Sequence, residues 1–301
     1  MDKKYEILMD TEKTVEGRVL HRIKALRDFD CVKTGDVGGW IEFEKNLSQE
    51  GESWIYDDAC VYENACIYDN ARIYGNAFIS GHTRVCGNAQ IYGKANISGE
   101  VTVDDQAHVG GYACISDFAR IYQNAIIAGY AKIYGRATIY EDALVTGEAK
   151  ICENARIHGD VVITRNAYVS GDMDISGNTT VTVDLSKNLK ESIRCQTGLG
   201  VLNNKVIAYK QVNKDLSSLH DPTFYYTVGE VVETLIKEKD LDKKKSCGTG
   251  LHFSNMNYWN NNCDIEQSTF LIAEIDLDDI IAVQSGKIRC KRAKILGTYE
   301  I

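Results

Sequence analysis

The chain lacks the sequence features of membrane and secreted proteins. None of its apolar runs approaches the roughly 18 residues that a membrane-spanning helix requires. Its first residues, MDKKYE, are charged and polar and do not resemble a secretory signal. We therefore expect a protein that has no membrane partner and stays in the cytoplasm where it is made.

The sequence also lacks a framework for disulfides or for a metal. Its 10 cysteines include no Cys-x2-Cys pair, the spacing typical of zinc knuckles. We therefore expect reduced thiols, no metal ion and no cofactor. Half of the cysteines lie beside core positions of the repeat described next, namely Cys60, Cys66, Cys86, Cys114 and Cys152.

A six-residue repeat organises the segment from Ile55 to Val181. Every sixth position is Ile or Val, 22 in all, and no insertion interrupts the series. Four residues after each of them, 16 of 21 positions are Ala, and Gly, acids and Asn fill most of the space between. A period of six fits neither a helix nor a single strand, so it predicts short strands separated by tight corners. Gly, Asn and Asp suit those corners because they reach positive φ at low cost.

This motif resembles the hexapeptide repeat of left-handed parallel β-helices, in which three hexads form one triangular coil. The resemblance implies a mainly β fold with about seven coils, and it implies that residues 18 apart stack on each other. Coils stacked at the interstrand spacing of about 4.8 Å would give a prism on the order of 35 Å long. We expect an N-terminal cap over residues 1–54, the β-helix over 55–185 and a small α+β domain over 186–301.

The segment before the first hexad has the composition of a cap. Two tryptophans, Trp40 and Trp54, supply apolar area just ahead of the first coil. The sequences around them, GGW and SWIYD, resemble those of the YdcK-like hexapeptide proteins of bacteria and phages. That resemblance covers roughly residues 16–184. It implies a fold and a phage association, and hence a host-cell cytoplasm, without an established activity.

The outward positions of the coils are candidates for binding. Arg84, Arg120 and Arg156 recur every 36 residues in one outward column, and Tyr122 and Tyr140 are 18 residues apart in another. These residues could form a contact face for a partner. Stacked side chains that only stabilise the sheet are the alternative.

A third column becomes apolar along its length, at Ile126, Leu144 and Val162. Exposed branched side chains in a row are unusual on a soluble surface. We expect this row to contact another subunit, giving a homo-oligomer, or to contact the C-terminal domain.

Many hexapeptide β-helices are acyltransferases, which makes that activity an alternative for this chain. Those enzymes place a catalytic His on or beside a loop that interrupts the coil. Here the register has no interruption, and His82, His108 and His158 lie within regular hexads. The sequence therefore disfavours this alternative.

The six-residue repeat is absent from residues 185–301, and their sequence predicts a small α+β domain. We expect strands over 206–212, 223–228, 269–275 and 287–296, and a charged loop over 237–245. The phrase SCGTGLHFS, residues 246–254, resembles a domain that ends many phage and viral repeat proteins.

The same phrase has a weaker likeness to ADP-ribosyltransferase-like folds. That likeness would place His252 and Tyr258 beside a nucleotide pocket and make Glu274 a candidate acid, although no convincing upstream motif supports it. A zinc site is a further alternative, and its four ligands would be Cys247, His252, Cys263 and Cys290.

The favoured interpretation is a non-enzymatic binding protein. Residues 51–184 carry 9 basic and 17 acidic side chains, a difference of −8, and no motif supplies a nucleophile with a base. The expected partner is a host protein or protein–nucleic acid complex, and a small nucleotide is a second ligand class. With the phage resemblance, this suggests an inhibitor of a host process such as a nucleic-acid-guided or nucleotide-signalling defence system.

Overall fold

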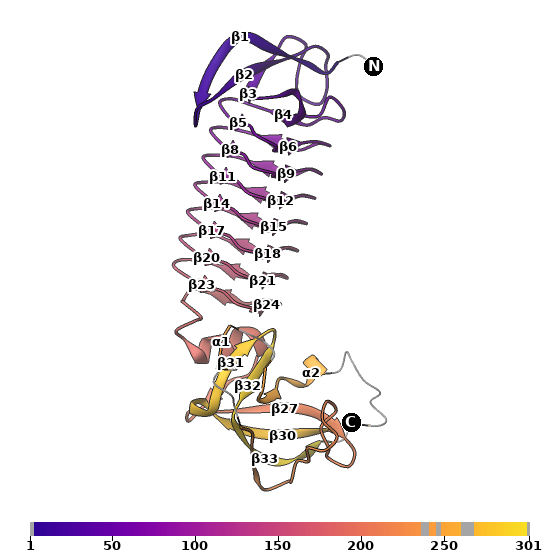
Figure 1. Ribbon diagram of the computed structural model, residues 1–301, viewed down its shortest axis with the longest axis vertical. Helices are drawn as coiled ribbons and strands as arrows, with labels where there is room; N and C mark the ends of the chain where they lie inside the picture. Colours follow the sequence, from indigo (N-terminus) through magenta and orange to yellow (C-terminus); the bar gives the residue numbers. More distant parts are fainter. Residues whose placement is uncertain (1–2, 236–240, 245–247, 260–267, 300–301) are drawn as a thin grey trace. The chain divides into compact units, whose positions relative to one another are not determined.

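The computed structural model of the protein describes residues 3–235, 241–244, 248–259 and 268–299 (Figure 1). The chain forms two compact units. The first comprises residues 1–168 with 177–183, and the second comprises residues 169–176 with 184–301. Within the described ranges, no helix is both long enough and apolar enough to cross a bilayer.

The first unit is built on a parallel β-solenoid, as the repeat predicts. Each hexad contributes one strand of two residues, and each strand pairs in parallel with the strand 18 residues away, as His108 pairs with Ile126. One sheet alone contains eight such strands, from β4 to β25. The strands are β4 (Trp54–Ile55), β5 (Cys60–Val61), β6 (Cys66–Ile67), β7 (Arg72–Ile73), β8 (Phe78–Ile79), β9 (Arg84–Val85), β10 (Gln90–Ile91), β11 (Asn96–Ile97), β12 (Thr102–Val103), β13 (His108–Val109), β14 (Cys114–Ile115), β15 (Arg120–Ile121), β16 (Ile126–Ile127), β17 (Lys132–Ile133), β18 (Thr138–Ile139), β19 (Leu144–Val145), β20 (Lys150–Ile151), β21 (Arg156–Ile157), β22 (Val162–Ile163), β23 (Tyr168–Val169) and β25 (Thr180–Val181). The hexad strand β24 (Asp174–Ile175) belongs to the second unit.

Three parallel sheets share these strands. One contains β4, β7, β10, β13, β16, β19, β22 and β25, and another contains β5, β8, β11, β14, β17 and β20. The third contains β6, β9, β12, β15, β18 and β21. The branched residue of each hexad is buried, and so is each Ala, because both project into the coil. The other residue of each two-residue strand projects outward, away from the core.

The corners explain why the repeat alternates between Gly and acids. The third residue of most hexads has positive φ, for example 66° at Gly75 and 51° at Asp57. At five corners that an acid occupies, the carboxylate accepts a hydrogen bond from a backbone N–H one coil further on. Gly75 donates to Asp57 at 2.8 Å, and Gly135 donates to Asp117 at 2.8 Å. Much of the acidity of this segment therefore stabilises corners.

The N-terminal cap is an antiparallel hairpin that continues one solenoid sheet. Strand β1 (Tyr5–Val15) pairs with β2 (Arg18–Ala25), which pairs with β3 (Val37–Ile41), and β3 adds in parallel to β5. The short helix η1 (Glu44–Asn46) follows. The sequence of residues 19–26 predicts a strand, which corresponds to β2, whereas β1 was not predicted. Trp54 is buried and packs edge-to-face with Tyr5 and Phe29, at ring-centroid distances of 6.2 and 5.4 Å.

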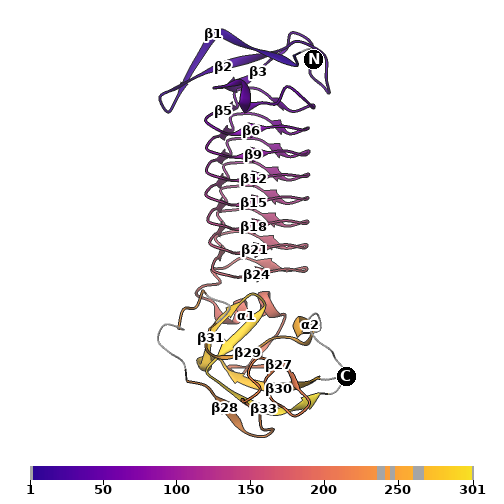
Figure 2. The same cartoon turned by 45° about the vertical axis from the view of Figure 1, so that its right-hand side comes forward.

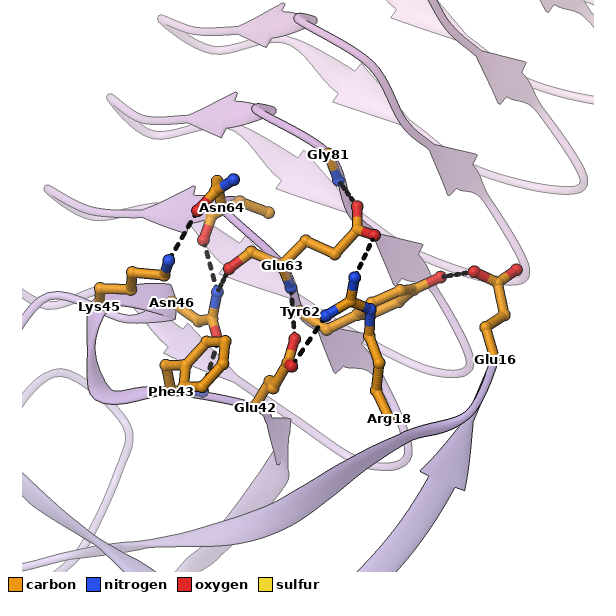
Figure 3. Close-up of polar contacts among 11 residues, drawn as sticks. Glu16, Arg18, Glu42, Phe43, Lys45, Asn46, Tyr62, Glu63, Asn64 and Gly81 are labelled. Carbon is orange, nitrogen blue, oxygen red and sulfur yellow. Dashed lines mark hydrogen bonds and ion pairs between the residues drawn. The ribbon is translucent and has the colours of Figure 1, made fainter.

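Polar side chains join this cap to the first coils (Figure 3). The Arg18 guanidinium donates to Glu42 at 3.0 Å and to Glu63 at 2.9 Å, so that one cation bridges two carboxylates. Asn46 donates to the carbonyl oxygens of Glu63 and Ala65 at 3.2 and 2.8 Å. These bonds satisfy backbone groups that would otherwise be open at the end of the stack.

The second unit is rich in β-structure. A five-stranded sheet has the order β26-β27-β30-β33-β28, and a three-stranded sheet has the order β29-β32-β31. Its elements are α1 (Leu189–Thr197), β26 (Val201–Leu202), β27 (Lys205–Asn213), β28 (Val231–Glu233), β29 (Leu251–Phe253), α2 (Met256–Trp259), β30 (Ser268–Asp276), η4 (Leu277–Asp279), β31 (Ile280–Gln284), β32 (Lys287–Cys290) and β33 (Arg292–Tyr299). Its core includes Ile193, Ala208, Phe253, Ala273 and Ile295.

Only some of the secondary structure predicted for this unit from the sequence agrees with the structure. The strands expected over 206–212 and 269–275 correspond to β27 and β30. The strand expected over 223–228 is wrong: turns lie at both ends of that segment, and between them Tyr225 forms only an isolated antiparallel bridge with Ser217. The strand expected over 287–296 is interrupted at Lys291, and helix α1 and strand β31 were not predicted. Part of the predicted loop over 237–245 lies outside the described residues.

Candidate functional site: a basic and aromatic face of the solenoid

One sheet of the solenoid presents a surface on which basic and aromatic side chains gather. Strands β6, β9, β12, β15, β18 and β21 lie one above another in this sheet (Figure 2). Their outward residues, and those at the adjoining positions of the same hexads, form what we call the basic face. It comprises His82, Arg84, Glu100, Thr102, Phe118, Arg120, Tyr122, Arg136, Thr138, Tyr140, Arg156 and His158.

The arginines of the basic face are exposed. Arg84 and Arg120 lie in one column, separated by Thr102. Since coils repeat at about 4.8 Å, their backbones are roughly 10 Å apart. No carboxylate within the described residues forms an ion pair with either arginine. Both guanidinium groups can therefore bind an anionic partner without breaking an internal contact.

Three aromatic residues of the basic face, Tyr122, Tyr140 and His158, form a continuous stack. The rings of Tyr122 and Tyr140 are 5.1 Å apart with 6° between their planes, and His158 stacks on Tyr140 at 4.7 Å and 5°. Arg156 donates to the Tyr140 hydroxyl at 2.9 Å. Partial burial raises the pKa of Tyr122. The three rings therefore form a parallel, half-buried stack along this side of the solenoid.

A shallow hollow of about 330 Å³ lies on the basic face. Phe118, 48% exposed, forms part of its lining, and the Arg136 guanidinium lies 5.7 Å from the Phe118 ring centroid. A partly exposed aromatic ring together with exposed arginines is a composition found at protein-binding surfaces. The residues that line the hollow are His82, Arg84, Glu100, Thr102, Phe118 and Arg120.

The structure thus places all five predicted binding residues on one side of the solenoid: Arg84, Arg120 and Arg156 lie on strands of one sheet, and Tyr122 and Tyr140 directly follow two of its strands. Sequence reasoning did not single out His82, Phe118, Arg136 and His158 for this face. The signal was present, because residues 82, 100, 118 and 136 are successive members of one 18-residue column. Basic charge collects here although the segment as a whole is acidic, because many of its acids lie in corners.

The predicted contact row lies on a different sheet of the solenoid. Ile126, Leu144 and Val162 are stacked in register on β16, β19 and β22. Ile126 is 40% exposed, while Leu144 and Val162 are half-buried. The row is therefore less exposed than the sequence suggested, and its contact with another subunit stays a prediction.

The candidate enzyme residues of the second unit do not form one site. Glu274 lies on β30 between core residues Ala273 and Ile275, so its side chain projects from the face opposite the core. There it pairs with Lys205 at 2.6 Å. His252 lies on β29 of the other sheet, and Tyr258 lies on α2. The arrangement does not support Glu274 as an acid acting with His252.

The zinc alternative cannot be built from the described residues. Cys247 and Cys263 lie outside them. Cys290 is buried, and burial raises the pKa of its thiol, which opposes the thiolate that a metal ligand requires. The eight cysteines within the described residues are free thiols.

The three histidines of the solenoid lie in regular positions. His82 is exposed beside the Asn64 amide at 3.4 Å, His108 pairs along β13, and His158 lies 3.6 Å from Glu141 and stacks on Tyr140. An acyltransferase needs a histidine aimed at a bound acyl group. The stacked and in-register positions of these side chains do not favour that alternative.

The comparisons with known proteins concern the solenoid repeat. Residues 65–81 match the family model described as YdcK beta solenoid repeat. The uncharacterized acetyltransferase YdcK of Escherichia coli (strain K12) is 48% identical over 44 residues, which are 15% of this chain and 14% of that protein. The chain therefore matches about a seventh of the length of this relative. The resemblance to YdcK-type repeats is confirmed, whereas the phage association and the resemblance of the C-terminal domain stay predictions.

Proposed function

We propose that the protein is a non-catalytic binding protein and that the basic face of the solenoid binds an acidic protein surface. The observation that carries this proposal is the pair of exposed arginines, Arg84 and Arg120, which line one hollow with Phe118 and form no ion pair with any described residue. Arginine and tyrosine are the side chains that most often anchor protein interfaces. A rigid stack of coils also loses little conformational entropy on binding.

The aromatic geometry favours protein over single-stranded nucleic acid. Nucleic acid binds such surfaces when bases stack on free aromatic ring faces. Here Tyr140 lies between Tyr122 and His158, so both of its ring faces are covered. Arg136 covers part of the Phe118 ring. The corner carboxylates and the net charge of −9 also repel phosphate chains.

An acetyltransferase function is named for the relative but finds less support here. The similarity covers a short part of that relative, and the histidines of this chain lie in regular hexads. We propose instead that the solenoid acts by occluding a surface. The setting that we infer from the resemblance to phage proteins is interference with a host process, such as a nucleic-acid-guided or nucleotide-signalling defence system.

The test is a comparison of variants in affinity capture from host lysate. We expect the native chain to capture a partner protein from the lysate. A double variant with Arg120→Glu and Tyr122→Ala should no longer capture it. The matched control combines Lys132→Glu with Tyr130→Ala, which changes an exposed cation and a stacked tyrosine on another sheet. This control should retain the partner.

Two results would contradict the proposal. One is equal capture by both double variants, because the basic face would then not be the binding surface. The other is saturable binding of a 20-nucleotide single-stranded DNA at physiological salt that the Arg120 variant abolishes, because the partner would then be a nucleic acid.

A further inference from the structure

Two exposed arginines of the basic face lie two coils apart. Arg84 pairs with Thr102 and Thr102 pairs with Arg120, on strands β9, β12 and β15 (Figure 2). Coils repeat at about 4.8 Å, so the two arginine backbones are about 9.6 Å apart along the solenoid axis. Thr102 is short and half-buried, whereas both arginines are exposed. The column therefore presents positive charge at two levels with a gap between them.

The coil between the two arginines carries acids. Glu100 lies two residues before Thr102, is exposed and lines the same hollow as both arginines. Asp104 lies two residues after Thr102 and is half-buried. The coils of Arg84 and Arg120 have no acid at the corresponding positions. The charge of this surface therefore changes along the axis from positive to negative and back to positive.

An α-helix matches this spacing better than an extended chain does. Seven residues of a helix rise about 10.5 Å in almost two full turns, so side chains seven residues apart lie on one face. The side chain four residues after the first lies between them, close to that face. A strand repeats on one face at about 6.6 or about 13 Å, and neither distance fits about 9.6 Å. A helix with acids seven residues apart would thus place one acid at Arg84 and the other at Arg120.

The hollow beside the arginines offers this helix an apolar contact. Phe118 lines it together with both arginines and is 48% exposed. Amphipathic helices bind grooves through such apolar anchors. With a volume of about 330 Å³, the hollow is too small to enclose a helix about 10 Å wide. The helix would therefore lie along the hollow, with one face in contact.

We propose that the partner presents an amphipathic α-helix to the basic face, with acids seven residues apart and a neutral or basic residue between them. This inference rests on the proposed function and specifies the shape and charge pattern of the acidic partner. Exposed ion pairs contribute little each, so selectivity depends on their spacing. Glu100 and Asp104 disfavour helices whose acids are closer together, because like charges would then face each other.

Fluorescence anisotropy with three labelled peptides and the full-length protein tests the proposal. The peptides are rich in alanine and about 20 residues long, which suffices for a helix in isolation. The first has two glutamates seven residues apart and a lysine four residues after the first glutamate. The second exchanges that lysine with the second glutamate, so its acids are four residues apart. The third is the first with a proline between the glutamates, which breaks the helix.

We expect the first peptide to bind at least about threefold more tightly than either of the others at low salt, where surface charges are least screened. Thr102→Arg combined with Arg120→Thr keeps the net charge but brings the arginines to about 4.8 Å, and should abolish this preference. Glu100→Gln should reduce the preference, because it removes an acid that opposes the second peptide.

The matched control moves a cation by one coil on another sheet. Cys114→Lys combined with Lys132→Cys does this on the paired strands β14 and β17, and should leave the preference unchanged. Circular dichroism and thermal unfolding check that each variant is folded.

Equal binding of the first and second peptides by the native protein would overturn the proposal, and so would absence of binding by all three. Tighter binding of the proline peptide would indicate an extended acidic segment instead of a helix. A preference that persists after the exchange of Thr102 and Arg120 would show that the arginine column does not set the spacing. Lysate capture tests the proposed function separately. A captured partner that Arg120→Glu with Tyr122→Ala abolishes, without any peptide preference, would retain the basic face as a binding surface and reject the helix.

Discussion

The carboxylate of Glu63 accepts a hydrogen bond of 2.7 Å from the backbone N–H of Gly81, 18 residues later. Its other oxygen binds Arg18 of the cap at 2.9 Å. One corner side chain thus links the N-terminal hairpin to a coil of the solenoid. The same corner geometry recurs along the stack without the cap.

We expect Glu63→Ala to destabilise the first unit by about 1–3 kcal/mol, because it leaves the Gly81 N–H and part of Arg18 without an acceptor. The measurements are thermal unfolding and amide exchange, in which the Gly81 amide should exchange faster. Glu52→Ala, at an exposed position of the cap, serves as the control. Equal stability of the two variants would show that the bridge contributes nothing.

The parallel stack predicts one long block of protected amides. Along the stack, backbone N–H groups donate to carbonyl oxygens one coil further on, as Arg120 does to Ala137, so we expect the amides between Ile55 and Val181 to open together. Hydrogen exchange followed by mass spectrometry checks this expectation. Two blocks that melt separately within the segment would contradict a continuous stack.

The stability of the second unit should depend on pH through His252. Burial, together with nearby cations, lowers its pKa to about 4 in the folded protein from an ordinary value of 6.5, so the unfolded chain binds more protons between these values. Stability should therefore fall as the pH drops from about 6.5 to about 4, by at most about 3 kcal/mol. Unfolding of the native protein and of His252→Asn tests this, and the variant should show a flatter pH profile.

Leu144→Glu tests the predicted contact row. A charge placed between Ile126 and Val162 should shift the oligomeric state or increase protease cleavage between residues 185 and 205, because burying an unpaired carboxylate is costly. Light scattering and limited proteolysis provide the measurements. Gln90→Glu, in the same column but outside the apolar row, is the control. If both variants behave as the native protein does, the row is ordinary surface.

Binding by the basic face should depend on a few anchors. We expect Arg120→Ala with Tyr122→Ala to weaken the partner complex by roughly 2–4 kcal/mol. Inhibition should scale with the molar ratio of protein to target, and His252→Ala should keep most of the effect. A folded His252→Ala variant without activity, or inactivation of a large excess of target by trace protein, would instead indicate catalysis in the second unit.

The solenoid could be predicted from the sequence because its period is local and repeated. Every hexad has the same pattern of a branched core residue, a small Ala and a corner. Because three equal hexads form one coil, residues 18 apart stack on each other. The columns of Arg84 and Tyr122 followed from that spacing alone. The second unit has no such repetition. Helix α1 and the break at Lys291 depend on contacts between distant segments, and His252 meets Arg289 only once β29 and β32 are paired.

Residues 18 apart stack on each other, so the outward side chains stay aligned only when hexads are gained or lost three at a time. Loss of a single hexad between Arg84 and Arg120 would keep every branched residue inside the coil. Each outward side chain after the deletion, however, would move to the neighbouring sheet. Arg120 and Tyr122 would then no longer lie on the same face as Arg84. Loss of three hexads would shorten the stack by one coil and leave every column aligned. Insertions or deletions of six residues therefore preserve the core, whereas only insertions or deletions of 18 residues preserve the surface pattern that a partner contacts.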